Sequence, residues 1–201
     1  KFKKINNFAK IAAKECFDQK IVGFFRNRLE FGDRALGCRS ILADPRPKEM
    51  KNKINDSIKY RESYRPFAPS VIDEKKNIFF DINQNQTSSY MEKVFKVKKK
   101  YQNKLQAITH IDGSARIQSV HKYVNGDFYK VLKEFEKLSG FPIILNTSFN
   151  INGEPIVCSP DDALNTFYNS KIDTLIIGSY IIRKQILNWT IVFESSWEEI
   201  R

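Results

Sequence analysis

Short apolar segments of strand length alternate with amphipathic segments of helical length along most of this chain. Apolar residues recur at helical spacing from Ile5 to Cys16 and from Asp127 to Ser139. Strand-like runs occupy 20–25 and 40–43. This alternation predicts an α/β layer structure, and an Asp-Gly turn at 112–113 predicts antiparallel neighbours, so we expect a mixed sheet with flanking helices, of the α/β or α+β class.

Other segments give more specific expectations. We expect residues 1–184 to form one domain and residues 185–201, with two tryptophans, to form a C-terminal tail that is either a docking element or part of the core. The remaining predictions are an edge or bulged strand at Phe67–Ile72 because of its prolines, a hairpin at Ile108–Val120, a solvated linker at Lys98–Lys104 and one final strand at Asp173–Lys184.

The chain carries a formal charge of +11, which favours a polyanionic partner such as nucleic acid, an acidic membrane surface or a phosphorylated small molecule. Three cysteines without CxxC spacing argue against a disulfide framework or a zinc site and fit a cytoplasmic location. No apolar run approaches the ~20 residues of a membrane helix, so we expect no membrane span. Because the chain begins with Lys1, we expect it to be part of a longer or processed protein.

The stretch Glu30–Ser70 concentrates basic side chains around two glycines, while the downstream stretch 145–150 reads LNTSFN and offers small polar groups. Arginine and lysine suit phosphate or carboxylate oxygens, and ligands in α/β sheets commonly lie at the carboxyl ends of strands. We therefore expect the two stretches to meet across one cleft that holds a nucleotide triphosphate. The basic residues of the first stretch include Arg34, Arg39, Arg46, Lys59, Arg61 and Arg65.

Within these stretches, Lys59-x-Arg61 and Ser148-x-Asn150 could neutralise and hydrogen-bond an ATP phosphate under attack. Taken alone, each short pattern is more typical of solvated surface. His110 is either a general base or a strand histidine hydrogen-bonded inside a polar cleft, and the sequence leaves both interpretations open.

In combination, KxR followed by SxN resembles the signature of YrdC-like domains that form carbamoyl-adenylates. Longer blocks are similar to the C-terminal domain of the NodU/CmcH/TobZ-type O-carbamoyltransferases, in consistent order from about Ile21 to Lys184. These blocks are EFGDRALGCRSILADPR, INDSIKYRESYRPFAPSVI, ITHIDGSARIQSV, GFPIILNTSFNINGEPIV and SPDDALNTF.

The resemblance implies a YrdC-like twisted, mostly mixed sheet with a central nucleotide-binding cleft. It implies that this domain binds ATP with Mg²⁺ and carbamoyl phosphate, and forms O-carbamoyladenylate with release of phosphate and pyrophosphate. A Kae1-like N-terminal domain of the same protein, which carries iron or another metal, would then transfer the carbamoyl group to a small-molecule or saccharide hydroxyl. No metal-ligating residue is expected in this chain.

The resemblance also implies roles for individual residues. Lys59 and Arg61 would hold the nucleotide phosphates, Arg34 and Arg116 would hold carbamoyl phosphate, and Ser148 with Asn146 would orient the carbamoyl group. The expected catalytic residues are Lys59, Arg116 and Ser148, and the expected substrate- or nucleotide-binding residues are Arg34, Arg39, Arg61, Arg65, His110, Asn146 and Asn150.

The chain departs from the usual FGPRALGNRS block at Asp33 and Cys38, and a carboxylate beside Arg34 weakens the hold of that arginine on an anion. Two other functions remain open. A threonylcarbamoyl-adenylate synthase also carries KxR and SxN, although the EFGxRALG and HIDGSAR blocks favour the carbamoyltransferase group. A non-catalytic basic module that binds nucleic acid is the other alternative, and we regard nucleic acid as the less expected partner.

Overall fold

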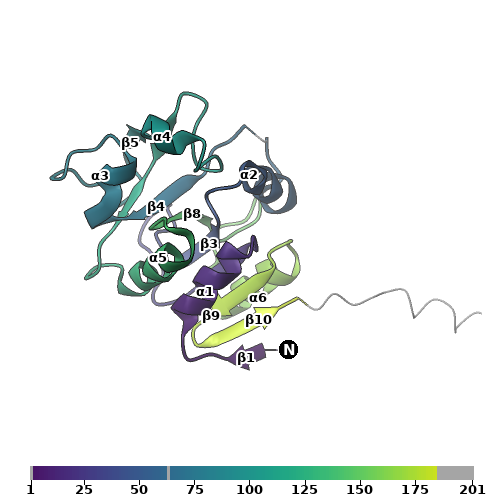
Figure 1. Ribbon diagram of the computed structural model, residues 1–201. Coiled ribbons are helices and arrows are strands. Elements are labelled where there is room, and N and C mark those ends of the chain that lie inside the picture. Colours follow the sequence, from purple (N-terminus) through teal and green to yellow (C-terminus); the bar gives the residue numbers. More distant parts are fainter. Residues whose placement is uncertain (1, 63, 185–201) are drawn as a thin grey trace, which may run out of the picture.

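The computed structural model describes residues 2–62 and 64–184, and it contains an eight-stranded mixed sheet (Figure 1). Strand pairs β2–β9 and β4–β7 are parallel and the other neighbours are antiparallel, so the predicted mixed α/β sheet is confirmed. Its strands, in spatial order, are β1 (Phe2–Lys4), β10 (Tyr180–Arg183), β9 (Thr174–Ile177), β2 (Val22–Phe25), β3 (Arg39–Ala43), β8 (Ile143–Ser148), β4 (Ala68–Ile72) and β7 (Gln118–Val120).

Helices cover both faces of this sheet. Helices α1 (Phe8–Phe17) and α5 (Gly126–Ser139) pack together on one face, as Figure 1 shows, while α2 (Lys48–Ile54) and α6 (Pro160–Tyr168) belong to the core of the other face. Strand β8 alternates between the two cores, because Ile144 packs with α1 and α5 whereas Ile143 and Leu145 join the opposite core. The remaining elements are a π-helical turn η1 (Asn55–Lys59), a 3₁₀ turn η2 (Asp73–Lys75), α3 (Lys76–Phe79), α4 (Lys99–Gln102), and a small sheet of β5 (Val94–Lys96) and β6 (Ser114–Arg116).

The boundaries of α5 and α6 follow local sequence signals. Helix α5 ends where Gly140 adopts φ of 77°, a left-handed conformation that glycine takes without a steric penalty. Helix α6 begins with a capping box, in which the Ser159 side chain accepts from the backbone of Asp162 and the Asp162 side chain accepts in return, with Pro160 in the first turn.

The prediction of an edge or bulged strand at Phe67–Ile72 is wrong, because β4 lies inside the sheet between β8 and β7. Its parallel pairing with β7 begins at Ser70, so Pro69 lies beyond the end of that short strand. An interior strand therefore tolerates this proline because β7 is only three residues long.

Three further segments differ from expectation. The segment 108–113 forms turns, and β6 pairs with β5 instead of closing a hairpin on Ile108, which is buried in the core. Residues 99–102 form α4, whose Tyr101 packs 4.7 Å from the Phe79 ring centroid, so this segment is no linker. The predicted single final strand is a hairpin of β9 and β10. The expectations for the tail at 185–201 lie outside the described residues.

None of the helices within residues 2–62 and 64–184 is long and apolar enough to cross a membrane.

Candidate functional site

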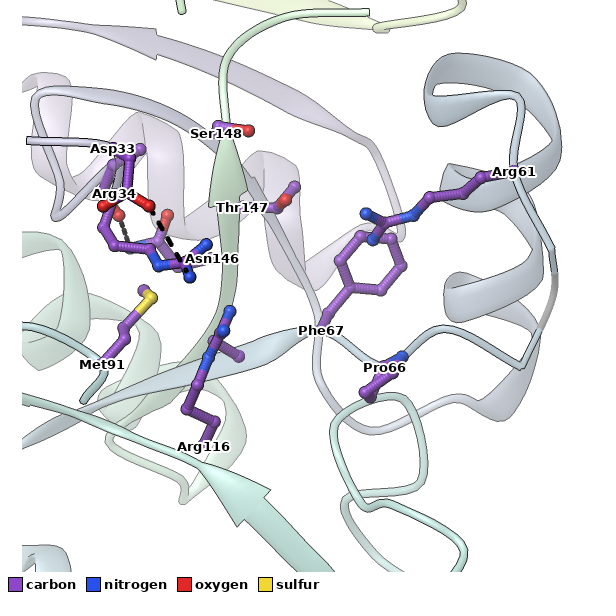
Figure 2. A pocket seen from close by; sticks show the side chains of 12 residues that line it. Asp33, Arg34, Arg61, Pro66, Phe67, Met91, Arg116, Asn146, Thr147 and Ser148 are labelled. Carbon is purple, nitrogen blue, oxygen red and sulfur yellow. Dashed lines mark hydrogen bonds and ion pairs between the residues drawn. The ribbon is translucent and has the colours of Figure 1, made fainter. Parts of the chain in front are cut away.

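A cavity of about 120 Å³ lies at the carboxyl end of β8, where five separate parts of the chain meet (Figure 2). The loop between β2 and β3 contributes Arg34, the segment before β4 contributes Arg61, and β6 contributes Arg116. The two stretches that the sequence singles out therefore do meet across one hollow. Its lining residues are Asp33, Arg34, Ala35, Arg61, Pro66, Phe67, Ala68, Met91, Arg116, Asn146, Thr147 and Ser148.

Three guanidinium groups converge on this cavity, and the surroundings of two of them, Arg61 and Arg116, penalise their charge. Burial, followed by the charge of Arg34, lowers the pKa of Arg116. Burial, followed by Arg65 and Arg116, lowers the pKa of Arg61. The Arg61 guanidinium is nonetheless fixed in place, because its Nε donates to Asn55 Oδ1 at 2.8 Å. Like charges held together in this way favour the arrival of an anion.

Lys59 lies behind the cavity wall instead of lining it. Its side chain is 5% exposed, and its Nζ lies 2.8 Å from the Ser148 carbonyl oxygen, 3.2 Å from Ser148 Oγ and 2.7 Å from Asn150 Oδ1. The Ser148 hydroxyl in turn donates to Asn150 Oδ1 at 2.7 Å. Burial, with a smaller contribution from Arg61, lowers the pKa of Lys59 to about 7. The ammonium group thus orders the end of β8, which presents Ser148 to the cavity.

Asn146 is almost fully buried at the floor of the cavity and belongs to a hydrogen-bond network. Its Nδ2 lies 3.0 Å from both Ser70 Oγ and Gln118 Oε1, and 3.1 Å from the Ala35 carbonyl oxygen. Gln118 Nε2 donates to the Leu36 carbonyl oxygen at 2.8 Å. These bonds attach the loop that carries Arg34 to strands β4, β7 and β8.

A second, more open hollow of about 390 Å³ adjoins the first and shares Asp33, Arg34 and Ser148 with it. Asn150 and Glu30 lie along it. The Glu30 carboxylate accepts from the backbone N–H groups of Leu36, at 2.8 Å, and of Cys38, at 2.6 Å, and so closes the loop that carries Arg34.

Two further residues of the loop between β2 and β3 have distinct properties: Gly37 lets the backbone pass close to Phe128, and Cys38 stays protonated. Gly37 has φ of 114°, and a Cβ atom there would lie 2.5 Å from Phe128 Cγ. Burial, followed by the Glu30 charge, raises the pKa of Cys38 to about 11, which leaves this side chain a poor nucleophile.

Besides Lys59, three of the predicted site residues line neither hollow. Arg39 is buried, donates to the carbonyl oxygens of Arg26, Asn27 and Cys38, and stacks 3.6 Å from the Phe25 ring centroid. Arg65 is half exposed and pairs with Glu62 at 3.1 Å. The His110 ring contacts Ser114 Oγ at 3.1 Å, and burial lowers its pKa. Arg39 therefore stabilises the turn around itself, whereas Arg65 and His110 lie beside the site.

Sequence reasoning missed several residues that shape the site. Ser70 and Glu30 were not singled out, because nothing in their local pattern indicates that one supports Asn146 and the other ties the Arg34 loop. Met91 lines the cavity from a turn with no motif of its own. Only Gln118 carried a signal, through its place two residues after Arg116 in the predicted hairpin, although the structure divides the two residues between β6 and β7.

The described residues contain no cluster of three or more His, Cys, Asp or Glu side chains that could hold a metal ion. Among the described residues that line the smaller cavity, Asp33 is the one with a carboxylate, and its Oδ2 lies 3.8 Å from Arg34 Nη2.

Comparison with solved structures supports the fold. The chain superimposes with a TM-score of 0.56 on part of the crystal structure of full-length HypF in the phosphate- and nucleotide-bound form. The match covers 88% of this chain and 22% of that one at 17% sequence identity, so it shows the shared fold alone.

Comparison with known sequences gives closer relatives. The chain is 47% identical to the nodulation protein NolNO of Sinorhizobium fredii, covering 90% of this chain and 27% of that protein. It is 45% identical to the nodulation protein NolO of Bradyrhizobium diazoefficiens, covering 90% of this chain and 33% of that protein. It thus spans about a third or less of the length of these relatives. The family model described as carbamoyltransferase C-terminus matches residues 13–184, and the chain belongs to that family.

Proposed function

We propose that this chain is the carbamoyl-adenylate-forming part of an O-carbamoyltransferase, and that its cavity at the end of β8 binds ATP and carbamoyl phosphate. The observation that carries the proposal is the convergence of Arg34, Arg61 and Arg116 on one hollow beside Asn146 and Ser148. Two phosphorylated anions repel each other, so a site that holds both needs several cations directed at the same small space.

The proposed reaction needs no nucleophilic side chain. Carbamoyl phosphate loses its phosphate to water, and an oxygen of the resulting carbamate attacks the α-phosphorus of ATP. The bond between that phosphorus and the bridging oxygen breaks, and pyrophosphate leaves with the electron pair. The arginines neutralise charge on the phosphoryl oxygens, and Ser148 Oγ, fixed by Lys59 and Asn150, offers a polar contact at the reacting group. Mg²⁺ would supply further charge neutralisation on the ATP phosphates.

A step after adenylate formation belongs to the rest of the protein. We propose that a Kae1-like N-terminal domain, for which relatives of about three times this length have room, transfers the carbamoyl group to an acceptor hydroxyl.

The test is pyrophosphate release from ATP in the presence of either carbamoyl phosphate or threonine plus bicarbonate. We expect release with carbamoyl phosphate and none with threonine and bicarbonate. Release only in the second mixture would replace the proposal with a threonylcarbamoyl-adenylate synthase. If neither mixture releases pyrophosphate, the measurement is repeated with the chain joined to its N-terminal domain, and failure there refutes the proposal.

A further inference from the structure

An exposed Asn-Gly pair lies in the turn that follows β8. Asn152 and Gly153 occupy the two central positions of this turn, which is closed by the Glu154 N–H. That N–H donates to the Ile151 carbonyl oxygen at 3.3 Å, and residues 152–155 are all exposed. Within the described part of the chain, neither the Asn152 side chain nor the Gly153 N–H has a hydrogen-bond partner. The side-chain amide and the N–H that follows it are therefore unshielded.

Two neighbouring amide groups of this kind can react with each other. The Gly153 N–H gives its proton to hydroxide, and the nitrogen attacks the side-chain carbonyl carbon of Asn152. The bond from that carbon to the side-chain nitrogen breaks, and ammonia leaves with a proton taken from water. A second water then opens the resulting succinimide ring at either of its carbonyl groups, which leaves an aspartate or an isoaspartate. Glycine favours the reaction because no side chain hinders the attacking nitrogen.

The other Asn-Gly pair of the chain, Asn125–Gly126, lies in a more restrained setting. Asn125 precedes α5, and its carbonyl oxygen accepts from the Tyr129 N–H at 2.8 Å, which begins the helix. Ring closure rotates the peptide group between asparagine and glycine, so at Asn125 it breaks this bond. At Asn152 the same peptide group is the central one of the turn, and the hydrogen bond that closes the turn can stay in place while it rotates.

We propose that Asn152 is a site of spontaneous deamidation, and that its products weaken anion binding at the end of β8. The turn is tied to the candidate site, because Asn150 Nδ2 donates to the Glu154 carbonyl oxygen at 2.6 Å while Asn150 Oδ1 accepts from Lys59 Nζ at 2.7 Å. An isoaspartate lengthens the main chain within the turn, and either product adds a negative charge near the hollow that Asn150 and Glu154 line. The second part of this inference rests on the proposed function, because it concerns the binding of ATP.

The first experiment compares the two Asn-Gly pairs within one sample. The folded chain is kept at mildly alkaline pH, which favours loss of the Gly153 proton, and the products are located by peptide mass spectrometry. We expect deamidation at Asn152 to be at least about tenfold faster than at Asn125, which corresponds to ~1.4 kcal/mol of additional barrier at the start of α5. In urea, where the helix and the turn are both unfolded, the two rates should be about equal. Equal rates in the folded chain would overturn the assignment, as would a tenfold difference that persists in urea.

The second experiment measures the effect of the modification on the site. Asn152→Gln is the matched variant, because glutamine keeps an amide but has to close a larger, less favoured ring. After equal incubation, isothermal titration calorimetry should show that the share of the unmodified chain that binds ATP falls in step with the share that is deamidated, whereas Asn152→Gln keeps its binding. Undiminished binding by a deamidated chain would overturn the link to the site. If the fresh chain fails to bind ATP, the proposed function is overturned instead, and the comparison of Asn152 with Asn125 still decides the modification.

Discussion

Substituting alanine for Gly37 should destabilise the protein by about 3 kcal/mol, because two separate penalties act at this position. Gly37 has φ of 114°, a conformation that costs a residue with a Cβ about 1–3 kcal/mol, partly offset by about 0.4–1 kcal/mol from the stiffer unfolded chain. The new Cβ would also lie 2.5 Å from Phe128 Cγ and 2.8 Å from Phe128 Cβ. Overpacking of this kind adds about 1–3 kcal/mol.

Gly32 provides a matched control in the same loop. Its φ is 120°, but a Cβ there would meet no heavy atom within 4 Å, so Gly32→Ala carries the conformational penalty alone, about 1 kcal/mol. Urea unfolding of both variants gives the two losses, and their difference of about 2 kcal/mol measures the contact with Phe128. Equal losses would refute the claim that α5 packs closely against this loop. We also expect Gly37→Ala to weaken carbamoyl phosphate binding, because the loop carries Arg34.

Other substitutions test single residues of the site. Burial lowers the pKa of Lys59 from its usual 10.5 to about 7 in the folded chain. Between pH 7 and 10.5 the unfolded chain therefore binds a proton that the folded chain lacks, and the free energy of unfolding should rise with pH over this range. When urea unfolding is measured at several pH values, Lys59→Met should lack this rise. A free energy of unfolding that rises with pH as steeply in the variant as in the unmodified chain would contradict the expectation. Arg39→Leu should lower the free energy of unfolding by about 2–4 kcal/mol, because three carbonyl oxygens lose their donor, and a loss below about 0.5 kcal/mol would contradict a structural role. Asp33→Asn should strengthen carbamoyl phosphate binding by about twofold to fivefold in calorimetry, since it removes the carboxylate 3.8 Å from Arg34, and weaker binding would show that Asp33 contributes to the site.

The sequence predicts best what is decided locally. The capping box at Ser159 and the glycine after α5 indicate helix boundaries directly, and the structure agrees with both. Resemblance over several blocks predicted a family that the comparisons confirm. The meeting of Arg34 and Asn146 was also anticipated, because it follows from placing polar residues at the end of a buried strand, whereas the place of Arg116 was implied by the resemblance alone.

The features that the sequence did not predict depend on pairing between strands that lie far apart in the chain. The prolines at the β4 segment indicated an edge strand. Because β7 is short, its pairing with β4 begins only at Ser70, and Pro69 has no partner residue on β7. The Asp-Gly turn suggested a hairpin, whereas β6 pairs with β5, about twenty residues upstream, and Ile108 is buried elsewhere.

The same limit applies within the site. The pattern KxR places Lys59 and Arg61 close in sequence, yet it does not reveal that Lys59 bonds the end of β8 while Arg61 faces the cavity. Likewise, Arg39 lies among other basic residues in sequence, but its guanidinium donates to backbone carbonyl oxygens.

The most direct test of the proposed site is the affinity for ATP at one fixed salt concentration in three variants that each remove a single positive charge. Arg61→Ala and Arg116→Ala change the cavity, whereas Lys99→Ala changes an exposed residue of α4 outside it. We predict that the two arginine variants each bind ATP at least about tenfold more weakly, as expected for charge-assisted hydrogen bonds, and that Lys99→Ala binds like the unmodified chain. Equal, small losses in all three variants would mean that the overall positive charge attracts ATP without a specific site, and would contradict the proposal.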